Sequence, residues 1–200
     1  MNEELSRKVN MKNIITSLFI FISLATINAQ NPGLVIYGGL SAMASKDKTI
    51  TPSGHFHYGW LAGADVRLLD GDLYFLIGGQ YQKSSIFSSS SPDFFSKRDL
   101  TLANGRLGMG FNIVHFSERV ALRSKLLASI NFVMEGPKEG LNKPGYNKLN
   151  DSFLGGVTGL GLTLGAFDFD LEYQYGVINA FYQQKNSTFS GISLLAGFHF

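Results

Sequence analysis

The sequence predicts an all-β fold: an eight-stranded antiparallel up-and-down transmembrane β-barrel with long extracellular loops and short periplasmic turns. Three observations predict it. An N-terminal segment has the pattern of an export signal, and the rest of the chain contains eight segments of about ten residues in which apolar residues take alternate positions. The charged residues of these segments lie opposite the apolar and aromatic residues, as they do in a barrel whose outer surface contacts lipid.

The composition fits one domain rich in β-structure. Of its 200 residues, 44% are hydrophobic and 16% are charged. The 23 glycines, 17 phenylalanines and 8 tyrosines suit strands, tight bends and the aromatic girdles of membrane barrels. Because there is no cysteine, the chain has no disulfide and no thiolate metal site. The formal charge of +2 is spread along the chain, which argues against a nucleic-acid-binding face, and we predict no cofactor.

Residues 11–30 have the layout of a secretory signal peptide. Lys12 supplies the positive start, residues 14–25 form a mainly apolar run, and Ala29 is the small residue expected before a cleavage site. An N-terminal membrane anchor is the alternative. The run is, however, shorter than the ~20 apolar residues that a membrane-spanning helix needs.

The predicted cleavage site lies between Ala29 and Gln30. The domains are then a signal peptide, residues 1–29, and an outer-membrane barrel, residues 30–200. Met11 is a second candidate for the first residue, because the ten residues before it add only a polar, charged preface.

The expected strands are residues 34–43, 55–69, 73–83, 100–114, 120–134, 152–164, 167–181 and 189–200. The connections between them alternate in length: residues 70–72, 115–119 and 165–167 are short, and residues 44–54, 84–99, 135–151 and 182–188 are longer. Asp70-Gly71 is a typical hairpin turn. Strict alternation places every long connection at one end, as in membrane barrels with short periplasmic turns. An even number of strands also puts both chain ends on the periplasmic side.

The strand charges indicate which face points inward. In residues 120–134, for example, Arg123 and Lys125 alternate with the apolar Leu126, Ile130 and Phe132. A charge on the lipid face costs ~2–4 kcal/mol at mid-bilayer, and buried charges of both signs can pair. We therefore predict an ion-pair network that fills the periplasmic half of the lumen. Its members are four acids and four bases: Asp65, Arg67, Arg106, Arg123, Lys125, Asp168, Asp170 and Glu172.

A soluble lipocalin-like barrel is the alternative, but it would have the reverse pattern, with apolar residues inside. Two strands alternate less cleanly because they contain several glycines. We expect these glycines to let strands bend or to leave room for bulky lumen side chains; they are Gly38, Gly39, Gly155, Gly156, Gly159 and Gly161.

With the export signal, the eight strands and the terminal Phe200, the chain resembles small outer-membrane barrels of the OmpX and OmpA type. The glycine- and tyrosine-rich strands and the sequence Asn28-Ala29-Gln30 are similar to the PorT-like barrels of the Bacteroidota. The last ten residues alternate apolar side chains and end in Phe198 and Phe200. In that family, such an ending is the signal that the barrel-assembly machinery reads. The resemblance implies no catalytic residue, and it implies outer-membrane lipids, lipopolysaccharide and the assembly machinery as partners.

Three groups of residues could carry further chemistry. His55 and His57 would face the same side of a strand and could bind a metal, although a site needs more ligands than two. His115, Ser117 and Glu118 have the residue types of a nucleophilic triad, but neighbours in sequence rarely converge as one. Solvated rim histidines and a plain polar turn are the simpler interpretations. Loop lysines that could contact lipopolysaccharide phosphates are Lys138, Lys143 and Lys148.

The function predicted from these observations is non-enzymatic: an outer-membrane barrel with a filled lumen and a structural or loop-mediated binding role at the surface of a Gram-negative bacterium. The alternatives are an outer-membrane enzyme that modifies lipid or peptide, and a component of a secretion or transport assembly. A small pore is disfavoured, because eight strands leave an interior just wide enough for side chains. The expected form is a monomer.

Overall fold

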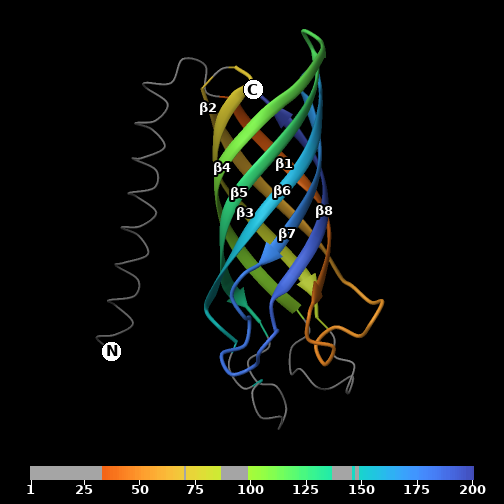
Figure 1. Ribbon diagram of the computed structural model, residues 1–200, viewed down its shortest axis with the longest axis vertical. Helices are drawn as coiled ribbons and strands as arrows, with labels where there is room; N and C mark the ends of the chain where they lie inside the picture. Colours follow the sequence, from red (N-terminus) through yellow and green to blue (C-terminus); the bar gives the residue numbers. More distant parts are fainter. Residues whose placement is uncertain (1–32, 70, 87–98, 137–145, 147–148) are drawn as a thin grey trace, which may run out of the picture.

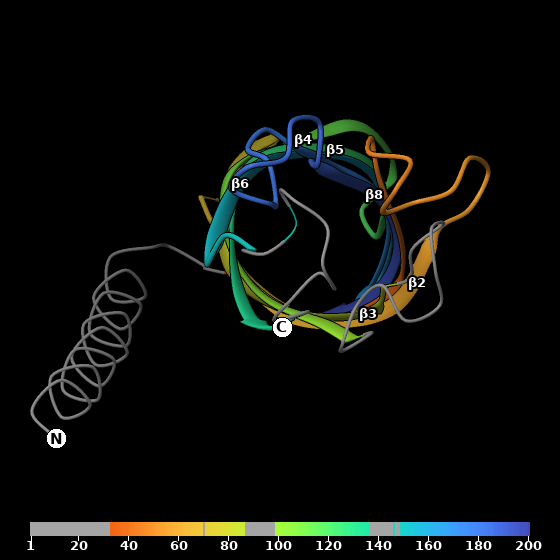
Figure 2. The same cartoon turned by 90° about the horizontal axis from the view of Figure 1, so that it is seen from below.

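The computed structural model describes residues 33–69, 71–86, 99–136, 146 and 149–200, and the strands within them form a closed barrel (Figure 1). The eight strands are β1 (Gly33–Ser45), β2 (His57–Leu68), β3 (Leu73–Ser85), β4 (Asp99–Ser117), β5 (Val120–Glu135), β6 (Ser152–Leu164), β7 (Phe167–Gly176) and β8 (Phe189–His199). Each strand pairs antiparallel with its neighbours in chain order, and β8 pairs with β1, which closes the ring seen end-on in Figure 2. The predicted fold class is confirmed.

The short and long connections separate to opposite ends of the barrel. The turns after β2, β4 and β6 lie at the upper end in Figure 1, together with the C-terminus. The backbone amide of Phe200 donates to the carbonyl of Leu34 over 2.9 Å, so the end of the chain is fixed to the first strand. The β6–β7 turn is tight because Gly165 adopts a φ of 64°, a left-handed conformation that glycine accepts without strain. Within the described part of the chain, no helix is long and apolar enough to cross a membrane.

Five predicted strand boundaries differ from the structure by two or more residues: the start of β2 and the ends of β1, β3, β4 and β7. β7 ends at Gly176, where a side chain would meet the backbone of Phe189, and not at residue 181. β2 begins at His57 and not at residue 55. β4 runs on to Ser117, so the predicted five-residue turn has only two residues; two register shifts bend this extension. In each case the alternation of apolar residues and the pairing of the backbone do not begin or end at the same residue.

The outer face of the barrel is apolar. Leu40, Leu126 and Leu194, on three different strands, are 69%, 60% and 61% exposed. Exposed aromatic side chains lie at both ends of this face: Trp60 packs on Tyr81 toward the loop end, and Phe167 packs on Phe198 toward the short turns. A barrel in water would hide these side chains, so the arrangement fits a barrel in lipid with aromatic girdles at both interfaces. The lipocalin-like alternative is excluded.

Candidate functional site

The short-turn half of the lumen contains eight charged side chains, from β2, β4, β5 and β7. The structure brings together all eight residues that the sequence nominated. They form a single ion-pair chain of alternating sign, in the order Arg67, Asp168, Arg123, Asp170, Lys125, Glu172, Arg106 and Asp65. We call this set the ion-pair chain.

The ion-pair chain has close contacts along its length. Arg123 Nη2 lies 3.1 Å from an oxygen of Asp168 and 3.1 Å from an oxygen of Asp170. Lys125 Nζ lies 2.5 Å from Glu172 Oε1, whose other neighbour, Arg106 Nη2, is at 2.8 Å. Taking a charge out of water costs several kcal/mol, which close partners of opposite sign offset. The alternating order therefore allows eight charges to be held inside a membrane barrel.

Neutral side chains bond several other polar atoms of the ion-pair chain. Thr163 Oγ1 donates to Asp168 Oδ1 over 2.7 Å, and Tyr37 donates to Asp65 Oδ1 over 3.2 Å. Arg106 Nη1 donates to Gln80 Oε1 over 2.6 Å. These bonds reduce the desolvation cost that the ion pairs leave uncompensated.

Interior glycines provide the space that these side chains occupy. A β-carbon on Gly161 would lie 1.9 Å from Asp170 Oδ1, and one on Gly78 would lie 2.0 Å from Asp65 Oδ1. Gly161 belongs to the set predicted to leave room for lumen side chains. Gly156, from the same set, instead points outward, where a β-carbon would meet only a backbone oxygen at 3.9 Å.

Uncharged polar side chains fill the middle of the lumen. Asn104 donates to Gln82 Oε1 over 3.4 Å, and Gln174 donates to Asn131 Oδ1 over 2.8 Å. A cavity of about 10 Å³ between Asn104, Ser129 and Glu172 has room for one water molecule. This layer joins the ion-pair chain to an apolar region at the loop end.

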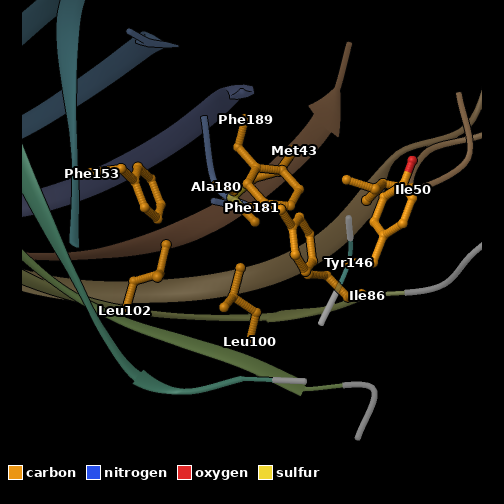
Figure 3. Close-up of a cluster of buried hydrophobic side chains, with 10 residues drawn as sticks. All are labelled: Met43, Ile50, Ile86, Leu100, Leu102, Tyr146, Phe153, Ala180, Phe181 and Phe189. Carbon is orange, nitrogen blue, oxygen red and sulfur yellow. The ribbon is translucent and has the colours of Figure 1, made fainter. Parts of the chain in front are cut away.

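Ten buried residues close the loop end of the lumen, and we call them the cap (Figure 3). Five come from strands: Met43, Leu100, Leu102, Phe153 and Phe189. The other five come from the four long connections, each of which supplies at least one: Ile50, Ile86, Tyr146, Ala180 and Phe181. Phe181 is fully buried and its ring packs edge-on against Tyr146 at 5.4 Å. The described part of each long connection therefore places at least one side chain in the mouth of the barrel.

Polar contacts join the loops around the cap. Tyr146 donates to the Asp47 carboxylate, which links the β5–β6 connection to the β1–β2 connection. Burial raises the pKa of the Tyr146 hydroxyl and the bond to Asp47 raises it further, so the phenol stays protonated and donates. Asn150 bonds the backbone of Asn179 and Ala180 over 2.7 Å each, which links the β5–β6 connection to the β7–β8 connection. The cap is thus one connected unit.

The cap was not predicted from the sequence. The predicted strand 167–181 included Phe181, but β7 ends at Gly176 and Phe181 is buried in the cap. Isolated apolar residues within otherwise polar loops, such as Ile50 and Ile86, were the available signal. Sequence alternation has no bearing on residues outside strands, so it could not show where they pack.

The two candidate catalytic or metal groups are not assembled as proposed. His57 is fully buried and lies 2.6 Å from Thr51 Oγ1, whereas His55 is exposed and precedes the strand, so the two do not share a face. His57 is therefore not a solvated rim histidine either. No group of three or more His, Cys, Asp or Glu residues suited to a metal occurs among the residues that the structure describes.

The triad-like residues lie at the tip of the β4–β5 hairpin. His115 Nε2 is 3.0 Å from Asp72 Oδ1, and Ser117 Oγ accepts a bond from the backbone amide of Arg119. The histidine is thus engaged with the β2–β3 turn instead of the serine. The candidate loop lysines 138, 143 and 148 and the predicted signal peptide lie outside the described residues.

The C-terminal aromatics lie on the outer face at the short-turn end. The rings of Phe198 and Phe200 are 4.8 Å apart, and Phe198 also packs edge-on against Phe167. Phe200 is exposed in this position, where lipid or another protein can contact it.

Solved structures similar to this chain are small barrels. Neisserial surface protein A is 17% identical, with a TM-score of 0.51, over 84% of this chain and 95% of that one. Ail, the attachment invasion locus protein of Yersinia pestis, crystallised with the heparin analogue sucrose octasulfate, is 15% identical, with a TM-score of 0.47, over 86% of this chain and 100% of that one. The outer membrane protein OprG from Pseudomonas aeruginosa is 11% identical, with a TM-score of 0.47, over 86% of this chain and 97% of that one.

The fold is that of a small outer-membrane barrel. The likeness to the neisserial protein shows this fold and carries no information about function at 17% identity. No protein-family model matches the sequence, and a comparison with curated proteins gives no match.

Proposed function

We propose that the chain is a non-enzymatic protein of the Gram-negative outer membrane whose closed cap serves as a rigid binding platform on the cell surface. The observation that carries this proposal is the cap itself, because all four long connections insert side chains into one buried cluster. Loops that are ordered before binding lose less conformational entropy when a ligand arrives. A rigid, closed platform therefore suits a role in ligand recognition better than a role in transport.

The filled lumen supports a binding role over a transport role. The ion-pair chain occupies the periplasmic half, and the cap closes the extracellular half. An eight-stranded barrel has an interior only wide enough for side chains. A wild-type protein in a planar bilayer is therefore expected to show no steady conductance.

Lipopolysaccharide is the partner that we propose for the rim of the platform. Lys46 Nζ lies 2.9 Å from the hydroxyl of Tyr175 and 4.8 Å from the centre of its ring. Tyr175 belongs to the outward-facing aromatic residues at the loop end of the barrel. Aromatic girdles mark the membrane interface, so the contact with Tyr175 supports a position of the lysine ammonium near the lipid headgroup phosphates.

The finer assignments rest on sequence features alone. These are the PorT-like class of the Bacteroidota, the signal peptide of residues 1–29, recognition of Phe198 and Phe200 by the assembly machinery, and a monomeric state.

Single cysteines test the topology on which the platform depends, because the natural chain has none. Ser53→Cys lies in the β1–β2 connection and Glu118→Cys in the β4–β5 turn, and both positions are exposed. We expect a membrane-impermeant maleimide to label intact cells carrying Ser53→Cys and to spare cells carrying Glu118→Cys until the outer membrane is opened. If intact cells were labelled at Glu118→Cys and not at Ser53→Cys, the barrel would have the opposite orientation in the membrane. That result would contradict the proposed platform.

Binding is tested separately with vesicles. The measurement is the amount of lipopolysaccharide that the reconstituted protein retains. Lys46→Gln should retain less than Lys185→Gln, which removes another exposed loop lysine. Equal retention by both variants would remove lipopolysaccharide as the rim partner and leave the topology untouched.

A further inference from the structure

A cavity of about 310 Å³ lies at the short-turn mouth of the barrel, beyond the end of the ion-pair chain. Its wall includes Arg67 and Arg123 from the ion-pair chain, His199 near the C-terminus, and the turn between β4 and β5. Small-molecule sites have volumes of roughly 300–1,000 Å³, so this cavity can take a small solute. It faces the periplasm, opposite to the cap.

The cavity is rich in positive hydrogen-bond donors. Arg67, Arg119 and Arg123 line it, and Glu118 is the one carboxylate among its described lining residues. The Arg119 guanidinium makes no ion pair with any residue that the structure describes. Arg67 and Arg123 are already paired with Asp168, so Arg119 carries the lining positive charge that no described carboxylate balances, and this favours a ligand with negative charge.

Two of these arginines keep unused donors. Asp168 engages Nη2 of Arg67 and Nη2 of Arg123, and the Nε of each arginine is buried with no acceptor in the described part of the chain. Arg123 is only 4% exposed. A guanidinium carries five N–H donors, and a buried donor without an acceptor destabilises the folded protein. An oxyanion that accepted from this cluster would recover part of that cost.

The arginines are also held in place before any ligand arrives. Asp168 is fixed by Thr163, and the Arg67 guanidinium lies 5.3 Å from the centre of the Tyr74 ring. The floor of the cavity is therefore part of the rigid lumen and not a mobile loop.

The β4–β5 hairpin supplies the outer wall, and it extends past the other short turns (Figure 1). β3 pairs with β4 only as far as Phe111, and β4 then continues to Ser117 through two register shifts. A bulge bends a strand and redirects its side chains. The bulged extension brings His115 and Arg119 to the cavity, so the extra length of this hairpin supplies part of the cavity wall.

We propose that this cavity binds the carboxylate or phosphate group of a small periplasmic solute. Arg119 approaches the group from the hairpin, and Arg67 and Arg123 approach it from the floor. Planar guanidinium groups match both oxyanions with paired hydrogen bonds. The cavity and the cap lie at opposite ends of the barrel, so this proposal can be tested separately from the proposed surface function.

Isothermal titration of the purified full-length barrel in detergent micelles tests the site. Inorganic phosphate and succinate are titrated separately at constant ionic strength, with chloride as the reference anion. We expect saturable binding of at least one. Tighter binding of phosphate would point to a phosphorylated solute, and tighter binding of succinate to a carboxylate.

Arg119→Gln should weaken that binding tenfold or more, because a hydrogen bond to a charged group contributes ~1.5–3 kcal/mol. This residue lies outside the ion-pair chain, and heat-dependent gel mobility reports whether the variant barrel is folded. Lys185→Gln, which removes the same charge at the opposite end, should bind as the wild type does. Absence of saturable binding for both anions, or equal affinities for the two variants, would overturn the proposal.

Discussion

The two halves of the lumen are closed by opposite chemistry. In the short-turn half, strand residues place eight charges in one alternating chain, and every member depends on its neighbours. In the loop half, an apolar cluster gathers side chains from the four long connections as well as from the strands. Removing one charge leaves its buried partners with one counter-charge fewer, whereas removing one apolar side chain leaves a cavity that neighbours can partly fill.

The difference has a consequence for stability. The ion-pair chain joins β2, β4, β5 and β7 across the barrel, so it contributes to the free energy of unfolding of the whole domain. The cap can open without separating the strands, and loops of this kind unfold locally at lower free energy. Changes in the short-turn half should therefore act on assembly and global stability, and changes in the cap should act on the loops.

The largest effect is expected from deletion of Phe200. The residue extends the pairing of β8 with β1 and lies at the short-turn rim beside Phe198. An unclosed sheet edge in lipid leaves backbone groups unsatisfied, so assembly should fail and most of the protein should be lost from the outer membrane. Immunoblots of outer-membrane fractions measure this, with a variant lacking residues 88–97 in the β3–β4 connection as the control. A normal level for the Phe200 deletion beside a defect in the loop variant would reverse the comparison.

Arg123→Ala should have the next largest effect. It leaves Asp168 and Asp170 short of a cation, and breaking a buried pair in this way costs about 3–5 kcal/mol. Urea unfolding of the barrel in lipid vesicles gives the loss. The double variant Arg123→Ala/Asp170→Asn should lose less than the sum of the single changes, because it removes part of the unpaired charge. Simple additivity would mean that the two side chains do not interact.

Phe181→Ala should affect the cap and spare the barrel. Truncating a fully buried phenylalanine costs about 3–5 kcal/mol in a packed core. If that cost falls on cap opening, proteolysis of the loops should accelerate about 100-fold to 4,000-fold, since each 1.4 kcal/mol is a factor of ten. Urea unfolding of the barrel should change little. The control is Tyr182→Ala, because Tyr182 is the next residue in the chain and its side chain is 72% exposed. A fall in global stability equal to that of Arg123→Ala would show that the cap and the wall unfold together.

The comparison also explains what the sequence could reveal. The membership of the ion-pair chain was predictable because strand residues alternate faces, so Asp168, Asp170 and Glu172 had to share one side. Their order along the chain of contacts was not predictable, since it depends on strand register and tilt across the barrel. The cap escaped prediction because its loop residues have no period, and Phe181 was misplaced by extending a strand pattern beyond Gly176.

The smallest effect, and the most specific test of the packed lumen, comes from two glycines on one strand. Gly161→Ala would force a β-carbon to within 1.9 Å of Asp170 Oδ1 and 3.0 Å of Arg123 Nη2, whereas at Gly156 the nearest atom is the backbone oxygen of Leu127 at 3.9 Å. Overpacking costs about 1–3 kcal/mol, so Gly161→Ala should lose that much in urea unfolding and Gly156→Ala should lose nothing measurable. Both changes have the same effect on strand propensity, and that contribution cancels between them. Equal losses would mean that the charged half of the lumen has room to spare, in which case the ion-pair chain would not fill it.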